Sequence, residues 1–161
     1  MSTVPIMDDL DAVMQVMDAA FDPAFGEAWT RKQVADALCM PNTWLLLADR
    51  TGAPPASPEQ TVGFALSRGA VGEEELLLIA VMPAMRGRGV GMRLLERLAQ
   101  DAADREVMRI FLEMRDGNPA LKLYRTFGFR EVGRRKGYYR KSKLGPIDAI
   151  TFAKELPGAI S

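Results

Sequence analysis

A glycine-rich turn with two arginines offers the clearest chemistry in this sequence. It reads Arg86-Gly87-Arg88-Gly89-Val90-Gly91 and lies between a run of apolar residues and a segment with helical spacing. Backbone N–H groups at the start of a helix bind anions, and the helix dipole adds to the attraction. Glycines let the backbone approach the anion closely, while Arg86 and Arg88 add charged donors at the rim. The turn therefore predicts a cradle for a pyrophosphate.

The spacing excludes two other phosphate motifs at this turn. A Walker loop ends in Gly-Lys-Ser/Thr, which is absent, and a dinucleotide fingerprint would place its third glycine at Met92 or Leu94. Two interpretations stay open beside a pyrophosphate cradle. One is a solvent-exposed tight turn without a ligand, and the other is a nucleotide site that would prefer ATP.

Two side chains further along the chain are suited to moving protons. Glu113 interrupts an otherwise apolar segment, where partial burial would raise its pKa toward a useful value. Tyr124 carries a phenol whose ordinary pKa of about 10 keeps it protonated at neutral pH. The chain has no histidine, so the usual neutral-pH base is missing. The simpler alternatives are an ion pair of Glu113 with Arg115 or Arg109, and a Tyr124 that only packs in the buried face of a short helix.

Two helices are predicted ahead of the first strand. Residues 8–21 carry apolar side chains at helical spacing, with Asp8 or Asp9 as the cap. Thr30 and Gln33 form a predicted capping box, in which each side chain serves the other's backbone donor, and this box opens a helix to about Leu38.

Strands and a crossover helix are predicted next. Residues 44–48 and 62–67 predict a hairpin around a proline-rich connection. The continuous apolar run 76–81 predicts a central strand buried on both faces, which ends before Pro83. A helix across residues 92–102 and a strand across 107–114 complete a strand–helix–strand unit, which implies a parallel crossover.

The last third of the chain predicts one short helix and two closing strands. Asn118 is expected to cap the helix, with Pro119 in its first turn and Gly128 at its left-handed end. The closing strands are expected near residues 129–134 and 147–153. The whole pattern predicts a mixed α/β sheet in a single domain that spans residues 1–161.

Composition limits the classes of partner. The chain has 161 residues and is 48% hydrophobic, and its 21 Lys and Arg balance 21 Asp and Glu, which argues against nucleic-acid binding by net charge. Cys39 is the only cysteine and is expected in the core, so neither a disulfide nor a multi-cysteine metal site is expected. No apolar stretch approaches the roughly 20 residues of a membrane span. We expect a cytoplasmic protein, with Glu73–Glu75 as a solvated run or an acidic rim for basic substrates.

These segments together resemble the GNAT superfamily of acetyltransferases and, within it, the RimI type, the ribosomal-protein-alanine N-acetyltransferases. The resemblance rests on Arg-x-x-Gly-x-Gly after Ile79-Ala80-Val81, on Ile110–Arg115 followed by Asn118, and on Leu123–Phe129. Trp29-Thr30, Gly133–Tyr139 and Asp148-Ala149-Ile150 add to it. It spans almost the whole chain and is strongest from Leu76 to Tyr139.

The resemblance implies the GNAT fold, a mixed sheet flanked by helices, whose central parallel strands splay apart to admit the pantetheine arm of acetyl-CoA. Acetyl-CoA is the implied cosubstrate, and no metal is implied. The cofactor-binding residues that it implies are Ile79, Ala80, Val81, Arg86, Gly87, Arg88, Gly89, Val90, Gly91 and Asn118.

The implied activity is direct transfer of an acetyl group to the N-terminal amine of a protein, specifically the N-terminal alanine of a small-subunit ribosomal protein. Glu113 is the implied general base, directly or through water, and Tyr124 the general acid, while Tyr138 and Tyr139 border the peptide groove. An α-amino group, with a pKa of about 8, is deprotonated by a weak base more easily than a lysine side chain, whose pKa is about 10.4. The alternatives are a GNAT enzyme that acetylates a small-molecule amine or another peptide, and a CoA-binding protein without catalysis.

Overall fold

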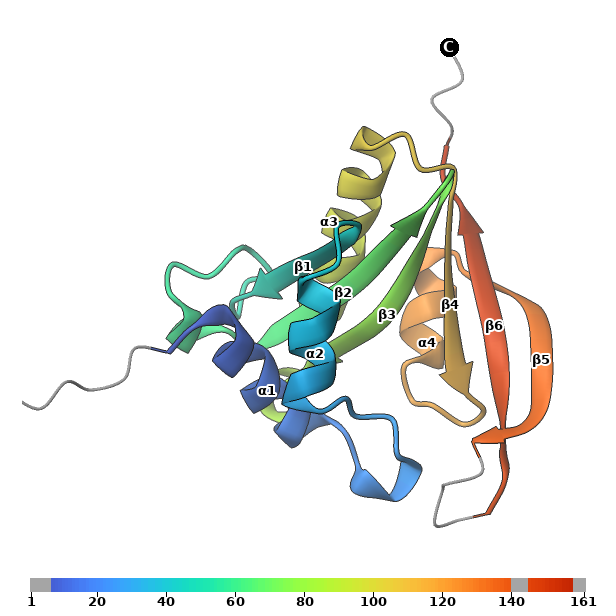
Figure 1. Ribbon diagram of the computed structural model, residues 1–161, viewed down its shortest axis with the longest axis horizontal. Coiled ribbons are helices and arrows are strands. Elements are labelled where there is room, and N and C mark those ends of the chain that lie inside the picture. The colour runs from blue at the N-terminus through green and yellow to red at the C-terminus, as the bar shows by residue number, and fades with distance from the viewer. Residues whose placement is uncertain (1–6, 140–144, 158–161) are drawn as a thin grey trace, which may run out of the picture.

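The computed structural model describes residues 7–139 and 145–157, which form a six-stranded mixed sheet with helices on both faces (Figure 1). The helices are α1 (Asp9–Ala20), α2 (Arg31–Leu38), α3 (Val90–Asp104) and α4 (Leu121–Phe127). The strands are β1 (Thr43–Ala48), β2 (Gly63–Ala70), β3 (Glu73–Val81), β4 (Arg109–Arg115), β5 (Arg130–Tyr139) and β6 (Ile147–Glu155). Their order across the sheet is β1-β2-β3-β4-β6-β5. The predicted mixed α/β fold is confirmed.

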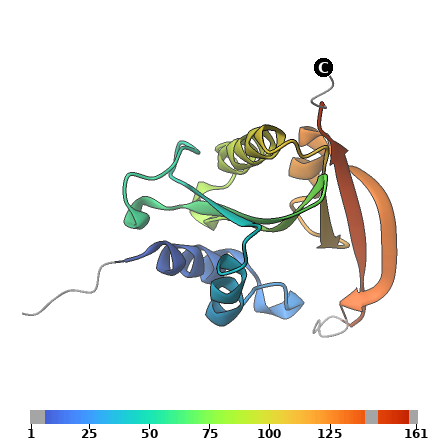
Figure 2. The same ribbon diagram turned by 45° about the horizontal axis from the view of Figure 1, so that its top comes forward.

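The first two helices begin at the predicted caps. Asp8 and Asp11 exchange side-chain to backbone hydrogen bonds at the start of α1. Thr30 and Gln33 do the same at the start of α2, which is the predicted capping box. Both helices lie on one face of the sheet (Figure 2). Their buried side chains form one core with those of the sheet: Val13, Val16, Met17, Val34, Phe64, Leu66, Leu78 and Ala80.

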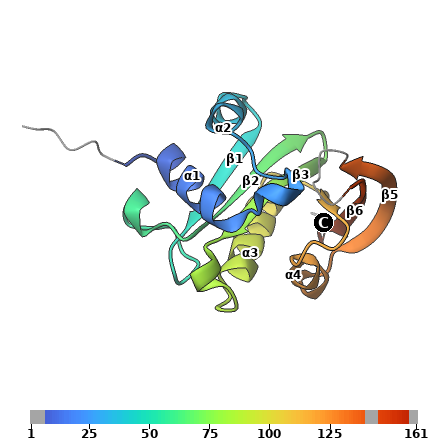
Figure 3. The ribbon, with the colours of Figure 1, turned by 90° about the horizontal axis from the view of Figure 1, so that it is seen from below.

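The opposite face of the sheet carries α3 and α4 (Figure 3). α3 buries one stripe of its surface, made of Val90, Leu94, Leu95, Leu98 and Ala102. Tyr124 of α4 joins the same core. The parallel pairing of β3 with β4 around α3 confirms the predicted crossover.

A bulge in β3 marks the point where the sheet divides. Leu66 of β2 pairs with Leu78, while the next residue, Ser67, pairs with Leu76, so that Leu77 is the extra residue. β3 pairs with β4 only from Glu73 to Leu76. Beyond Leu76 the two parallel strands diverge, as Figure 1 shows. A bulge bends its strand and increases the local twist, which is consistent with this divergence.

The paired half of β3 contains a fully buried carboxylate. Glu74 accepts a hydrogen bond from Ser67 Oγ at 2.9 Å and forms an ion pair with Arg105. The prediction of a solvated run at residues 73–75 is wrong for this residue, because alternation along the strand turns Glu74 into the core. Glu73 and Glu75 pair with Arg109 and Arg68.

Four smaller features differ in how well they match their prediction. Cys39 is exposed at the end of α2, so its predicted place in the core is wrong. Gly128 ends α4 with φ +111°, as predicted. β5 continues past its predicted end at Arg134 and includes Tyr138 and Tyr139. Within the described ranges, none of the helices is long and apolar enough to cross a membrane.

Candidate active site

The divergence of β3 from β4 opens a cleft of about 1110 Å³. This volume is slightly above the roughly 300–1,000 Å³ of typical ligand pockets. Its walls come from the ends of β3 and β4, the glycine-rich turn, α4, β5 and residues 20–29 between α1 and α2. The site therefore lies at the gap in the sheet.

One wall of the cleft is the edge of β3 itself. Residues Leu78–Val81 pair with β2 on one side, and on the other side β4 has already turned away. Ile79, Ala80 and Val81 all line the cleft. A strand with a free edge offers backbone donors and acceptors to an extended ligand that carries amides.

The glycine-rich turn closes one end of the cleft. Gly87 has φ +77° and Gly89 has φ +83°, backbone conformations that residues other than glycine rarely adopt. The first bond within α3 runs from Arg93 N to Gly89 O, which leaves the N–H groups of the first turn without intrahelical partners. These donors suit a phosphate. Gly91 serves a different purpose, because an added Cβ would lie 3.0 Å from Leu123 Cδ2 and disturb the packing of α3 on α4.

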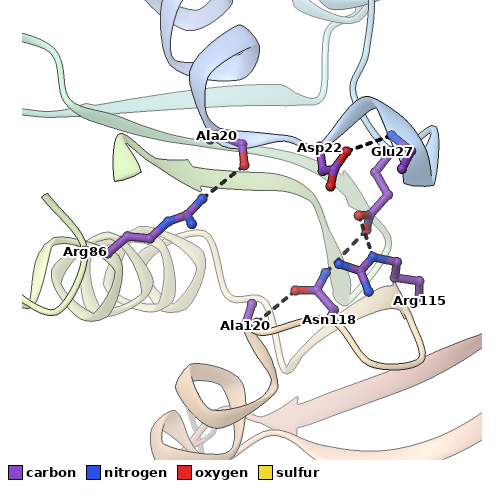
Figure 4. Close-up of polar contacts among 8 residues, drawn as sticks. Ala20, Asp22, Glu27, Arg86, Arg115, Asn118 and Ala120 are labelled. Carbon is purple, nitrogen blue, oxygen red and sulfur yellow. Dashed lines mark hydrogen bonds and ion pairs between the residues drawn. The ribbon is translucent and has the colours of Figure 1, made fainter. Parts of the chain in front are cut away.

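The two arginines of the turn differ in position. Arg86 lines the cleft and donates from Nη2 to the carbonyl oxygen of Ala20 at 3.0 Å, at the end of α1 (Figure 4). Arg88 is exposed and is not part of the cleft lining. The structure thus brings Arg86, but not Arg88, to the cavity.

Glu113 lies on β4 directly after Leu112, the last residue paired with β3. Its side chain is 22% exposed and faces the cleft, with Oε2 3.5 Å from Nη2 of Arg135 on β5. Arg109 and Arg115, the partners that the simpler interpretation suggested, pair instead with other carboxylates. Glu113 is therefore a cleft carboxylate with one weak ion pair.

Tyr124 lies in the floor of the cleft. Its ring packs edge-on against Phe129, with centroids 5.8 Å apart. Burial, and next the charge of Glu27, raise the pKa of Tyr124 well above its ordinary value. The phenol consequently keeps its proton at neutral pH.

Tyr138 and Tyr139 border the cleft from the end of β5. Their rings stack edge to face with centroids 5.3 Å apart. Tyr138 is exposed beside Arg135, whereas Tyr139 is half-buried. Burial, followed by the charges of Glu27 and Glu113, raises the pKa of Tyr139 to about 12.

A family model described as an acetyltransferase (GNAT) domain matches residues 42–131, more than half of the chain. The chain belongs to the GNAT acetyltransferase family. This membership confirms the family resemblance, the GNAT fold and the enzyme class that the sequence predicted.

Two relatives are similar to this chain in sequence. A [ribosomal protein bS18]-alanine N-acetyltransferase of Haemophilus influenzae is 37% identical over 94 residues, which cover 58% of this chain and 64% of that protein. An N-alpha-acetyltransferase RimI of Mycobacterium tuberculosis is 45% identical over 84 residues, or 52% of this chain and 49% of that protein. The matched segments thus span less than two thirds of either relative.

Solved GNAT structures have the same fold. The ribosomal-protein-S18-alanine N-acetyltransferase from Escherichia coli superposes with a TM-score of 0.78 at 27% identity, over 99% of this chain and 96% of that one. Arabidopsis thaliana NAA60, in complex with a bisubstrate analogue, gives 0.75 at 19% identity, over 97% and 98% of the two chains.

Within this GNAT fold, Asn118 has a different local role from the one expected. The residue that precedes α4 is Ala120, which has no side-chain cap, so Asn118 is not the N-cap. Asn118 instead forms a turn two residues earlier, where its Oδ1 accepts from Ala120 N at 2.8 Å. Its Nδ2 donates to Glu27 at 3.3 Å, and the residue lines the cleft.

Sequence reasoning missed two charged residues of the GNAT cleft. Glu27 enters it from the segment between α1 and α2, and Arg115 from the end of β4, with Arg115 Nε 2.8 Å from Glu27 Oε1. They are 88 residues apart. The only sequence signal for Glu27 was a carboxylate between Phe25 and Trp29, in a segment that is otherwise apolar and small.

Proposed function

We propose that this protein transfers the acetyl group of acetyl-CoA to the N-terminal amine of a protein, and that its substrate is the N-terminal alanine of a small-subunit ribosomal protein. The observation that carries the proposal is that one cleft is lined by the glycine-rich turn and also by Glu113 and Tyr124. The names of the relatives from Haemophilus influenzae and Escherichia coli support the choice of substrate.

The residues present fit acetyl-CoA. The free edge of β3 at Ile79–Val81 would pair with the amides of the pantetheine arm, as an added strand does. The N–H groups at the start of α3 would receive the pyrophosphate, with Arg86 beside them. When bound, acetyl-CoA supplies the activated acetyl group. A relative in structure, Arabidopsis thaliana NAA60, has also been solved with acetyl-CoA.

Glu113 and Tyr124 divide the proton transfers between them. An amine must lose a proton to attack a thioester, and Glu113 lies in the cleft as the base, acting directly or through a water molecule. The departing thiolate needs a proton, which the phenol of Tyr124 would donate. The buried phenol is protonated at neutral pH, so it has a proton to give at that step.

The acceptor peptide would enter past Tyr138 and Tyr139. The edge-to-face pair gives an apolar wall with hydroxyl groups at its rim, which suits a short extended peptide. Glu75, also in the cleft lining, would place a negative charge near a basic residue that follows the terminus.

The test is CoA release with acetyl-CoA and a peptide that begins Ala-Arg-Tyr-Phe. The same peptide with a blocked N-terminus and a lysine-containing peptide with a blocked N-terminus serve as controls. We expect turnover on the free terminus alone. Turnover restricted to polyamines or amino sugars would overturn the substrate, and acetyl-CoA binding without turnover on any amine would overturn the enzymatic function.

A further inference from the structure

A second carboxylate shares the cleft with Glu113. Glu27 lies between α1 and α2 and extends from that side of the cleft toward β4 (Figure 4). Its side chain is 14% exposed. It lines the same cavity as Glu113 and Tyr124, and the proposed mechanism gives it no task.

The position of the Glu27 carboxylate is fixed from both sides. Oε1 accepts from Arg115 Nε at 2.8 Å, and Oε2 accepts from Asn118 Nδ2 at 3.3 Å. The Arg115 guanidinium also lies 3.6 Å from the centre of the Phe25 ring, so the segment holds β4 at two points. Asp22 holds the start of the same segment by accepting from Ala24 N at 2.9 Å. A carboxylate held this way is preorganised for a ligand.

These contacts leave the carboxylate with capacity for another donor. An ionised carboxylate has about four acceptor positions, and the contacts with Arg115 and Asn118 occupy two. Since the residue lines the cavity, a ligand with N–H donors has access to it. A cationic nitrogen would form the strongest such bond.

The negative charge of Glu27 acts on two tyrosines of the cleft, Tyr124 and Tyr139. It raises the pKa of both Tyr124 and Tyr139, in each case as the largest contribution after burial. At Tyr139 the contribution of Glu27 exceeds those of Glu113 and of Arg115, which acts in the opposite direction. Arg115 therefore does not cancel the charge of its partner at this point of the cleft. An amine that arrives as its ammonium form would be attracted here.

We propose that Glu27 binds the acceptor's amine, accepting a hydrogen bond from its α-ammonium group and holding the nitrogen beside Glu113. Glu113 remains the base that takes the proton, and Glu27 contributes affinity and orientation. The inference rests on the proposed function for the class of acceptor, a peptide with a free N-terminus.

The test must distinguish this role from a purely structural one, in which Glu27 only holds the segment between α1 and α2 against β4. Two peptides serve as probes: one begins with alanine, and in the other a propionyl group replaces that alanine and so removes only the amine. Their dissociation constants are measured calorimetrically in the presence of CoA, for the wild type and for Glu27→Gln. Glu59→Gln, which changes an exposed carboxylate outside the cleft, is the matched control.

We expect the wild type and Glu59→Gln to bind the amine peptide roughly 10-fold more tightly than the propionyl peptide, or better, which is the range of a hydrogen bond to a charged group. In Glu27→Gln this ratio should fall to about threefold or less, while the affinity for the propionyl peptide changes little. An equal loss of affinity for both peptides would show that Glu27 has a purely structural role and would overturn the proposal.

The remaining outcomes are also decisive. A wild-type preference that persists in Glu27→Gln overturns the role of Glu27 and leaves the proposed function intact. A wild type that does not distinguish the two peptides also overturns the role of Glu27, while CoA release on the free terminus decides the proposed function separately. If Glu27→Gln does not fold, Glu27→Asp takes its place, because it keeps the charge but withdraws the carboxylate by one methylene. An unchanged ratio in that variant would again overturn the proposal.

Discussion

Along the first half of their shared length β3 and β4 are paired, from Glu73 with Arg109 to Leu76 with Leu112, and along the second half they are separated by the cleft. Each half contains a glutamate turned inward: Glu74, the middle one of three glutamates in the paired half of β3, and Glu113 in the separated half of β4. In the paired half, Glu74 is fully buried with a hydroxyl and a guanidinium as partners. In the separated half, Glu113 has a single ion pair at 3.5 Å and faces the cavity.

The difference shows how one pair of strands serves both stability and chemistry. Where the strands pair, the buried carboxylate of Glu74 has both a hydroxyl and a guanidinium as partners, so its removal should destabilise the fold. Where they separate, polar side chains keep unused hydrogen-bonding capacity and remain available to ligands. Substitutions in the two halves should therefore affect different measurements.

The largest effect is expected from Glu113→Gln, which tests the separated half. Loss of a general base should lower turnover roughly 100-fold or more. The free energy of unfolding should change by less than about 0.5 kcal/mol, because the side chain has one weak partner. Steady-state assays and urea unfolding give the two values, with Glu155→Gln at the exposed end of β6 as the control. Full activity would remove Glu113 from the mechanism.

Tyr124→Phe removes the proposed acid from the same half and preserves the ring that packs on Phe129. We expect turnover to fall roughly 100-fold, with acetyl-CoA affinity within about threefold of the wild type. Single-turnover kinetics and calorimetry make this comparison. A fall in affinity that accounts for all of the lost activity would assign the hydroxyl to binding instead.

Glu74→Ala tests the paired half. It should lower the free energy of unfolding by about 2–3 kcal/mol, since Ser67 and Arg105 lose their acceptor. Arg105 is 27% exposed and reaches water, which keeps the loss below that of a fully buried pair. Activity per folded molecule should persist. Glu73→Ala, its half-exposed neighbour, is the control for urea unfolding, and equal losses in the two variants would contradict the distinction.

The smallest effect, counted per pH unit, is expected from raising the pH, and it concerns the buried phenol. The folded pKa of Tyr124 lies above the unfolded value of about 10, so its contribution to stability is complete below pH 10 and is lost as the pH rises toward the folded pKa. Above about pH 10 the free energy of unfolding should fall by about 1.4 kcal/mol per pH unit for this group. Tyr139 adds to the slope up to about pH 12. Urea titrations of wild type and Tyr124→Phe should differ by one such slope, and identical slopes would refute the assignment.

Much of the architecture was predictable because its signals are local. The capping box at Thr30 and Gln33, the left-handed Gly128 and the stripe of α3 each depend on residues a few positions apart. The burial of Glu74 was not predictable in this way, since its partner Arg105 comes from the far end of α3. Glu27 and Arg115 meet only when the chain folds, so no spacing between them in the sequence carried a signal.

The bulge at Leu77 changes which face of the sheet the apolar residues of β3 occupy. Before the bulge, Leu76 packs in the core beneath α3; after it, Leu78 and Ala80 pack in the core beneath α1 and α2. One inserted residue thus exchanges the two faces of the strand, and uniform aliphatic side chains make that exchange harmless. Deleting Leu77 is expected to straighten β3 and extend its pairing with β4. The bulge at Leu77 directly follows the last pair between β3 and β4, so this one residue stands at the boundary between the paired sheet and the open cleft.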